Sequence, residues 1–214
     1  MLKKTAPTRS SGIATPLALI LIAVVPIVVV ALVLIPFYIS GYNKAVRFEK
    51  AAEEAWANVD VQLQRRLDLI PNLVESVRGY ASHERELFES IAAARTKYFQ
   101  TESVAGKIEA SNGLSGLLSR LLVLRETYPD LKANQNFLAL QDQLEGTENR
   151  IAVARTRYNA AVTRLNTYAR EFAGSFFAKR AGVESMPLFE ATAQAQEEVP
   201  AVDFSTRAPE PAAK

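Results

Sequence analysis

The sequence contains no cysteine and a single histidine, and these two absences exclude several kinds of protein. Without cysteine there is no disulfide framework, no cysteine-ligated zinc site and no thiol nucleophile. One histidine, His83, is too few for a multi-histidine metal site, so we expect neither a metal nor a cofactor.

An excess of charge of either sign is also missing. Lysine and arginine number 25 against 23 aspartates and glutamates, and residues 42–185 alone hold twenty basic and eighteen acidic residues. A nucleic-acid-binding protein would concentrate basic residues on one element, so we expect no nucleic-acid partner. No glycine-rich phosphate loop and no paired nucleophile and general base are recognisable, which argues against an enzyme and against a small-molecule substrate.

Charge is absent altogether from residues 16–39, a run of 24 residues. Because about 20 apolar residues cross a bilayer as a helix, residues 16–40 are predicted to be a transmembrane anchor that follows a short basic segment, residues 1–15. The alternative is a cleaved signal peptide. Its apolar stretch would be shorter, about 7–15 residues, and small residues would precede the cleavage site, where Tyr38 stands here.

The charges around the span determine less strongly on which side of the membrane the rest of the chain lies. Three basic residues lie on each side of the run: Lys3, Lys4 and Arg9 before it, and Lys44, Arg47 and Lys50 after it. The amino terminus adds one more positive charge before the span. By the positive-inside rule this excess favours an extracytoplasmic position for the rest of the chain.

Residues 41–185 read as a helical domain. They contain only two prolines, Pro71 and Pro129, and apolar residues recur at three- and four-residue steps. The pattern predicts a first helix that breaks or kinks at Pro71, a second helix from Leu73 to Tyr98, a looser region over 100–112, and a third helix that Pro129 ends.

The fourth helix, 134–170, has the most regular pattern. Its apolar positions follow a 4-3 spacing at Leu140, Leu144, Thr147, Ile151, Ala154, Tyr158, Ala161, Leu165, Tyr168 and Phe172. A heptad pattern of this length requires a long packing partner. The predicted fold class is therefore all-α, with an N-terminal single transmembrane helix followed by an elongated antiparallel bundle of about four long helices.

Residues 186–214 are rich in alanine, proline and glutamate, which is typical of a mobile tail. Phe189 and Phe204 leave open the alternative that the tail docks on the bundle.

Four polar residues flank Pro71: Arg65, Arg66, Asp68 and Asn72. Arg66 falls on the apolar stripe, so its guanidinium must be paired or must reach the surface. One interpretation is an anion site of paired arginines at a helix break. The other, which we favour, is a structural one, because capping and a buried ion pair account for every polar residue present.

Two further groups of polar residues are interpreted as structural. Glu84 follows His83, but the second histidine of a metalloprotease motif is missing, so we expect Glu84 to pair with Arg66 or Arg155 across the bundle. Glu148, Arg155 and Asn159 lie beside the heptad positions of the fourth helix, where polar residues usually set the register between helices.

Several blocks of the sequence form a recognisable set. They are Tyr42-Asn43, Ala55-Trp56, the run VQLQRRLDLIPNLV at 61–74, GYASHE at 79–84, YPDLKAN at 128–134, LEGTENRIAVAR at 144–155, Tyr158-Asn159 and Tyr168, with Phe189-Glu190 and Val202-Asp203-Phe204 near the end. Together these blocks resemble the LemA family. The resemblance covers the chain from about the membrane span to the tail, and the first dozen residues lie outside it. It implies a single-pass bacterial membrane protein with long antiparallel helices and no established reaction.

Two functional hypotheses follow. The first is a non-enzymatic scaffold or adaptor in the bacterial cytoplasmic membrane, anchored in the bilayer through residues 16–40, with a protein partner or a second copy bound to its helical faces. The alternative is a membrane-remodelling or lipid-contacting protein, as the magnetosome-associated members of the family suggest. Lys44, Arg47 and Lys50 are the basic residues placed for such contact, with Glu49 and Glu53 among them.

Overall fold

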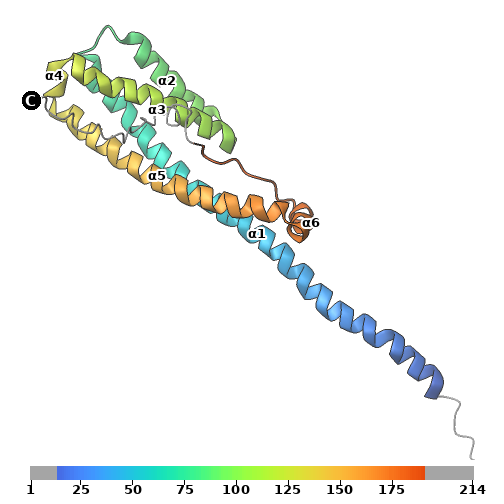
Figure 1. The fold of residues 1–214 in the computed structure, drawn as a ribbon. Helices are drawn as coiled ribbons and strands as arrows, with labels where there is room; N and C mark the ends of the chain where they lie inside the picture. Colours follow the sequence, from blue (N-terminus) through green and yellow to red (C-terminus); the bar gives the residue numbers. More distant parts are fainter. Residues whose placement is uncertain (1–13, 191–214) are drawn as a thin grey trace, which may run out of the picture. The chain divides into compact units, whose positions relative to one another are not determined.

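The computed structural model describes residues 14–190 of the chain, and every regular element in this part is a helix (Figure 1). The helices are α1 (Ala14–Arg78), α2 (Arg85–Gln100), α3 (Val104–Thr127), α4 (Pro129–Lys132), α5 (Gln135–Arg170) and α6 (Phe172–Ala181). The all-α prediction is confirmed. The described residues form two compact units, 14–57 with 160–186 and 58–159 with 187–190, and each is treated separately below.

The unit of residues 58–159 is a four-helix antiparallel bundle. Tyr98 of α2 contacts Asp60 of α1, and Arg95, further back on α2, contacts Leu67, further along α1. These two helices therefore run in opposite directions. In the same way Ser111 and Arg125 of α3 contact Arg155 and Gln141 of α5, which makes α3 and α5 antiparallel as well.

The heptad positions of α5 lie in the core of this bundle. Leu144, Thr147, Ile151, Ala154 and Tyr158 are all buried, and the facing positions of α1 are buried too, among them Val59, Leu63, Arg66 and Ile70. The predicted fourth helix matches α5 to within a residue at its start. The regular spacing of its apolar residues was thus a dependable signal of a long, partly buried helix.

The helix boundaries around Pro71 differ from the prediction. α1 continues through Pro71 to Arg78, and the chain turns only at residues 79–84 before α2 begins at Arg85. Of the two outcomes predicted at Pro71, the break is therefore wrong, and the kink stays a prediction. The expected second helix is in fact the last turns of α1, a loop that includes Gly79, and then α2.

A side chain from another helix explains why α1 tolerates this proline. Pro71 has no N–H, so the carbonyl of Leu67, four residues earlier, lacks its usual donor within the helix. The guanidinium Nε of Arg95 in α2 donates to this carbonyl at 3.1 Å. The interhelical bond replaces the missing intrahelical one, so this carbonyl is not left unpaired.

The prediction of a looser region over 100–112 is also mostly wrong, because α3 begins at Val104. Ser103 is its N-cap, and its side-chain oxygen accepts a hydrogen bond from the backbone N–H of Gly106 at 3.2 Å. This cap starts the helix despite the glycines that follow. The predicted end is confirmed, since α3 stops at Thr127 and Pro129 occupies the first turn of α4.

The other unit joins the N-terminal part of α1 to the end of α5 and to α6. The hydroxyl of Tyr168 donates to the carbonyl of Gly41 at 2.8 Å, and its ring lies edge-on to Phe48 with centroids 5.4 Å apart. The ammonium of Lys44 lies 4.9 Å from the same ring. Tyr168 therefore fixes the end of α5 against α1, while Phe172, expected on the α5 seam, is 99% exposed and begins α6.

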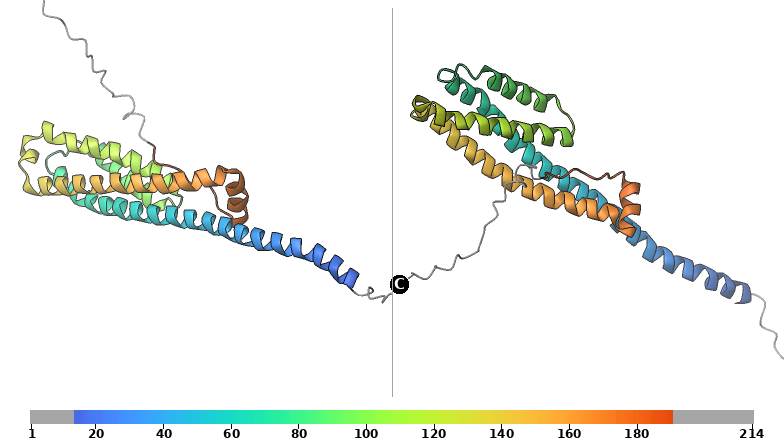
Figure 2. Two further views of the ribbon diagram at one scale, coloured as in Figure 1. Left: turned by 60° about the horizontal axis from the view of Figure 1, so that its bottom comes forward. Right: turned by 45° about the horizontal axis from the view of Figure 1, so that its top comes forward.

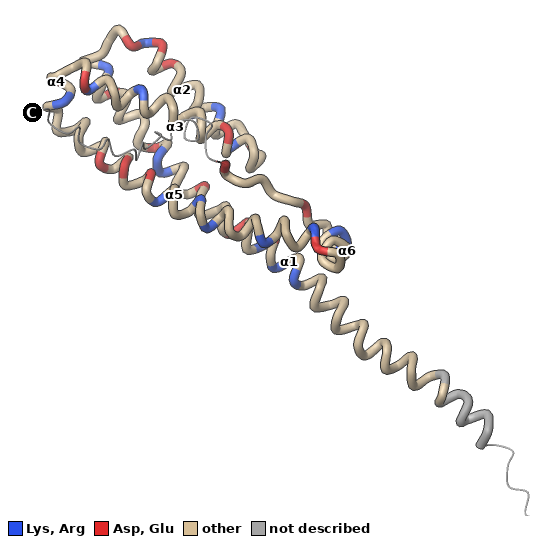
Figure 3. Tube along the Cα trace, viewed as in Figure 1, with Lys and Arg blue, Asp and Glu red and all other residues tan. Residues whose placement is uncertain are grey.

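The apolar segment of α1 has no protein partner over most of its described length. Its most apolar 18-residue window has a mean hydropathy of 2.5 and is 0% buried, and α1 is the one described helix that is long and apolar enough to cross a membrane. Figure 3 shows no charged residue on the described part of α1 before Lys44. An apolar surface of this extent is typical of a lipid-facing segment.

The bond between Arg95 and Leu67 can be tested with a double-mutant cycle. Arg95→Met should lower the free energy of unfolding by about 1–3 kcal/mol, because it leaves the Leu67 carbonyl without a donor. In a Pro71→Ala background the same change should cost about 1 kcal/mol less, since the substituted alanine supplies the missing N–H. The cycle is measured by chemical denaturation, and equal costs in both backgrounds would contradict the explanation.

Candidate functional site

A buried arginine is the centre of the polar residues in the bundle. The side chain of Arg66 is 2% exposed and contacts two other helices. Its Nη1 donates to Glu148 Oε2 on α5 at 2.6 Å and to the Ser115 hydroxyl on α3 at 3.0 Å, while Nη2 donates to the Ser111 carbonyl at 3.3 Å. One guanidinium thus links α1, α3 and α5.

A second arginine lies beside the first. Arg155 of α5 donates from Nη2 to the Ser111 hydroxyl at 3.1 Å, and its guanidinium lies 4.7 Å from the Phe189 ring centroid. Burial lowers the pKa of Arg155; the negative charge of Glu148 opposes this shift, and the positive charge of Arg66 adds to it. Two positive charges with one carboxylate between them are costly to bury unless their hydrogen bonds are well formed.

Three of the eight predicted site residues therefore meet: Arg66, Glu148 and Arg155. Asn159, one turn further along α5, bonds instead to the backbone of Phe189. Four others lie apart from this cluster, with Arg65, Asp68 and Asn72 exposed on α1 and Glu84 just before α2.

The expected partner of Arg66 was wrong. Arg66 pairs with Glu148 and not with Glu84, and Arg155 binds Ser111. The apolar stripe had placed Glu84 inside a continuous helix. In the structure Glu84 lies just before a helix, because α2 starts only at Arg85. Its side chain makes no capping hydrogen bond there.

Two serines of α3 complete the cluster and were not predicted. Ser111 is buried, at 1% exposure, and Ser115 is one turn further on. Ser111 lies three residues before Leu114 on the apolar stripe of α3. A small polar residue on an apolar stripe is a signal for a buried polar partner, and it could have pointed to Arg66.

A second polar group joins α1, α2 and α3. The hydroxyl of Tyr98 donates to Asp60 Oδ1 at 2.6 Å, and the ammonium of Lys107 lies 3.0 Å from the same oxygen. Burial raises the pKa of Tyr98, and its hydrogen bond to Asp60 raises it further. This group was also missed, because Asp60 looked like an ordinary surface residue in the sequence.

Residues 186–189 lie along α5 and are held through their backbone. Asn159 donates to the carbonyl of Phe189 and accepts from its N–H, both at 2.9 Å. Asn166 makes the same pair of bonds with Met186, at 2.9 and 3.0 Å. The Tyr158 hydroxyl donates to the Pro187 carbonyl at 2.7 Å, and burial raises the pKa of Tyr158 to about 12.

Docking of Phe189, which the sequence left open, is therefore observed. The Phe189 side chain is buried and its ring lies edge-on to that of Tyr158, with centroids 5.8 Å apart. Phe204, the other candidate for docking, lies outside the described residues.

A pocket of about 230 Å³ lies beside the arginine cluster, lined by Arg66, Ser115, Leu118, Ser119, Leu122, Leu144, Glu145 and Glu148. Arg66 presents its positive charge there already paired with Glu148. Two carboxylates on the wall disfavour an anion in this pocket, since like charges repel. The cluster also lacks the hydrogen-bonded nucleophile and base that a hydrolytic site needs.

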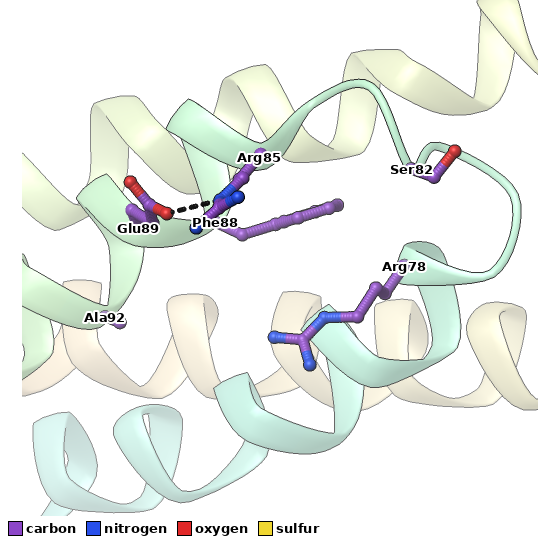
Figure 4. A pocket seen from close by; sticks show the side chains of 6 residues that line it. All are labelled: Arg78, Ser82, Arg85, Phe88, Glu89 and Ala92. Atoms are coloured by element: carbon purple, nitrogen blue, oxygen red, sulfur yellow. Dashed lines mark hydrogen bonds and ion pairs between the residues drawn. The ribbon is translucent and has the colours of Figure 1, made fainter.

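A larger pocket, about 430 Å³, lies between the end of α1 and the start of α2 (Figure 4). The Phe88 ring extends into it, with Arg78 on one side and Arg85 on the other. Both arginines are exposed and paired, Arg85 with Glu89 at 2.8 Å and Arg78 with Glu75 at 3.6 Å. Within residues 14–190, no group of three or more His, Asp or Glu side chains is placed to hold a metal ion.

Comparisons with known proteins give a consistent result. The LemA family model matches residues 55–204. A protein named LemA from Metamycoplasma hominis is 22% identical over 170 residues, which cover 79% of this chain and 75% of that protein.

Magnetosome proteins are also similar to this chain. Magnetosome protein MamQ 2 of Paramagnetospirillum magneticum is 24% identical over 175 residues, and magnetosome protein MamQ of Magnetospirillum gryphiswaldense is 23% identical over 174. The matched region covers 70% and 69% of this chain and 64% of each magnetosome protein, so more than a third of each of those proteins lies outside the similarity.

The ion pair of Arg66 gives a testable expectation for stability. Glu148→Gln should lower the free energy of unfolding by about 1.5–3 kcal/mol, because it leaves a buried guanidinium without its counter-charge. The matched control is Glu145→Gln, one turn earlier on α5. Both carboxylates are partly exposed, but Glu145 accepts from the neutral Gln141, so a change within about 0.5 kcal/mol is expected. Equal losses in both variants, measured by urea denaturation, would show that Arg66 does not depend on Glu148.

The backbone bonds of Asn159 give a second expectation. Asn159→Ala removes both hydrogen bonds to Phe189, worth together about 2 kcal/mol, so the Phe189 amide should exchange with deuterium about thirtyfold faster. Asn149→Ala, an exposed asparagine on the same helix, should leave that exchange rate unchanged. An unaltered Phe189 amide in Asn159→Ala would mean that other contacts hold the segment in place.

Proposed function

Because the chain belongs to the LemA family, we propose that it is a non-enzymatic scaffold or adaptor of the bacterial cell envelope. In this proposal residues 16–40 anchor it in the cytoplasmic membrane, and residues 41–185 form a helical bundle that holds a partner protein or a second copy. The carrying observation is that Arg66 binds Glu148 and Arg155 binds Ser111 within the bundle, while the apolar part of α1 is left uncovered by protein.

The hydrogen bonds of the core support a structural role. The two Nη atoms of Arg66 donate to Glu148, Ser115 and Ser111, and the side-chain amide of Asn159 binds the backbone of Phe189. A catalytic group would need a side chain poised toward a substrate, whereas these groups are turned toward neighbouring helices. Their arrangement fits helices held in one register, which is what a rigid binding surface requires.

The exposed apolar side chains of the bundle support a binding role. Val61, Phe99, Val123 and Val153 are each more than half exposed. Val123 also lines a pocket of about 390 Å³ between α2 and α3, together with Leu87 and Leu124. Apolar residues at the edge of a groove are common anchors for a partner helix.

The second candidate is a protein whose main contact is with lipid. Three similar proteins are named for the magnetosome, which supports a role at a membrane for this family. The two candidates share the anchor and differ in what the rest of the chain touches. The position of the bundle outside the cytoplasm belongs to the proposal as well, since the basic residues around the span favour it only slightly.

Site-specific photo-crosslinking in living cells distinguishes the candidates. A photoreactive amino acid at Val123 of the full-length protein should give one defined adduct, either with a particular envelope protein or with a second copy. The matched control places the same amino acid at Glu126, which lies one turn away on α3 and is exposed and charged. The adduct should be absent there, and the exposed Phe99 of α2 serves as a second position for the photoreactive amino acid.

Saturating illumination that returns only the monomer from both Val123 and Phe99 would contradict the scaffold proposal. Adducts to many abundant proteins in equal yield would contradict it too, because they indicate a generally sticky surface instead of a specific one.

A further inference from the structure

We propose that α6 is a second membrane-contacting element, which lies in the interface of the bilayer beside the point where α1 leaves it. The inference rests on the proposed anchor and adds a lipid contact about 140 residues further along the chain. All the residues concerned belong to the unit of residues 14–57 and 160–186.

The position of α6 relative to the apolar segment is fixed by aromatic contacts. The Phe177 ring lies 5.6 Å from that of Phe37 and 5.8 Å from that of Tyr38, and the Phe176 ring lies 6.4 Å from that of Tyr38. Phe177 is also packed closely against Gly41, where any Cβ would overlap its ring. α6 is therefore attached to the last turns of the charge-free run.

The depth of this attachment follows from the length of the run. The hydrocarbon core is about 30 Å thick, so about 20 residues of a helix fill it. Starting from residue 16, they reach to about residue 36. Phe37, Tyr38 and Gly41 then lie at the headgroup level, where aromatic side chains collect, and α6 lies beside them.

The direction of α6 suits a helix in the plane of the membrane. In the views of Figure 2, α6 runs across the direction of the neighbouring part of α1 instead of along it. A helix that crosses a transmembrane segment at its end lies flat on the bilayer surface.

The exposed face of α6 has the composition of an interfacial helix. Phe172 is 99% exposed and Phe176, one turn later on the same face, is 59% exposed. Lys179 and Arg180 are exposed in the last turn, and α6 itself has no acidic residue. Exposing a phenylalanine side chain to water is unfavourable in free energy. In the interfacial region of a bilayer the two phenylalanines contact lipid, and the two cations contact anionic headgroups.

Two contacts of Tyr168, one with Gly174 and one with Gly41, hold α6 in place. A Cβ at Gly174 would overlap the backbone carbonyl of Tyr168, so the turn from α5 into α6 is compact. Tyr168 is itself bonded to Gly41. The phenylalanines are thus presented by a fixed helix beside the membrane segment, and a bilayer is the occupant that both the aromatic and the basic residues fit.

Spin labels measure this contact directly, and the chain has no native cysteine to remove. The full-length protein is labelled at Phe172→Cys and reconstituted in vesicles of phosphatidylethanolamine and phosphatidylglycerol. Two labelled positions on α1 serve as references. Val33→Cys lies within the apolar segment, and Ala51→Cys lies at an exposed position, about 18 Å along the helix from Ile39. Collision with oxygen, which is enriched in lipid, is compared with collision with a water-soluble nickel chelate.

We expect the ratio of oxygen to nickel accessibility at position 172 to be several-fold above that at position 51 and closer to that at position 33. Lys179→Glu with Arg180→Glu should reduce the ratio at position 172 without changing it at position 33. Phe172→Ser should keep the melting temperature, since this side chain is 99% exposed, whereas Phe177→Ser should lower it.

Other outcomes overturn the inference in distinguishable ways. If position 172 resembles position 51 while position 33 is in lipid, α6 lies in water and only this inference fails. If position 33 is also accessible to nickel, the anchor itself is wrong and the proposed function fails with it. Spectral broadening at position 172 that disappears on dilution with unlabelled protein would assign the face to a second copy.

Discussion

The bundle depends on one buried charge. Arg66 is placed on the apolar face of α1, where its guanidinium cannot be solvated, so α3 and α5 must bring oxygen atoms to it. Only one alignment of the three helices places Ser111, Ser115 and Glu148 around it. Apolar side chains can slide past one another at little cost, whereas a buried cation with three acceptors cannot, which makes Arg66 a determinant of register rather than a large source of stability.

The proline in α1 illustrates the same principle with a backbone group. A carbonyl that loses its donor inside a helix must find another one, and Arg95 supplies it from α2. In both cases the group that needs a partner is on α1, and other helices supply that partner: α3 and α5 for Arg66, and α2 for the Leu67 carbonyl. The parts of the bundle that look most irregular in the sequence, a proline and a buried arginine, are the places where the helices are tied together.

The sequence revealed the elements that depend on periodicity. The seam of α5 and the charge-free run of α1 are long, regular patterns, and both are helical as predicted. The break at Pro71 and the pairing of Glu84 were wrong because each depends on a residue remote in the sequence, Arg95 in one case and Glu148 in the other. Rules based on local sequence describe what proline does to an isolated helix. They do not take account of a hydrogen-bond donor that a neighbouring helix contributes.

The two asparagines of α5 have a consequence for how the segment after α6 can vary. Asn159 and Asn166 recognise only amide and carbonyl groups, which every residue but proline offers in full. Pro187 is tolerated where it stands because only its carbonyl is used, by Tyr158. Homologous chains are therefore free to exchange the side chain at position 186 for almost any other, while a proline at 186 or 189 would remove one of the two hydrogen bonds that the asparagine makes there.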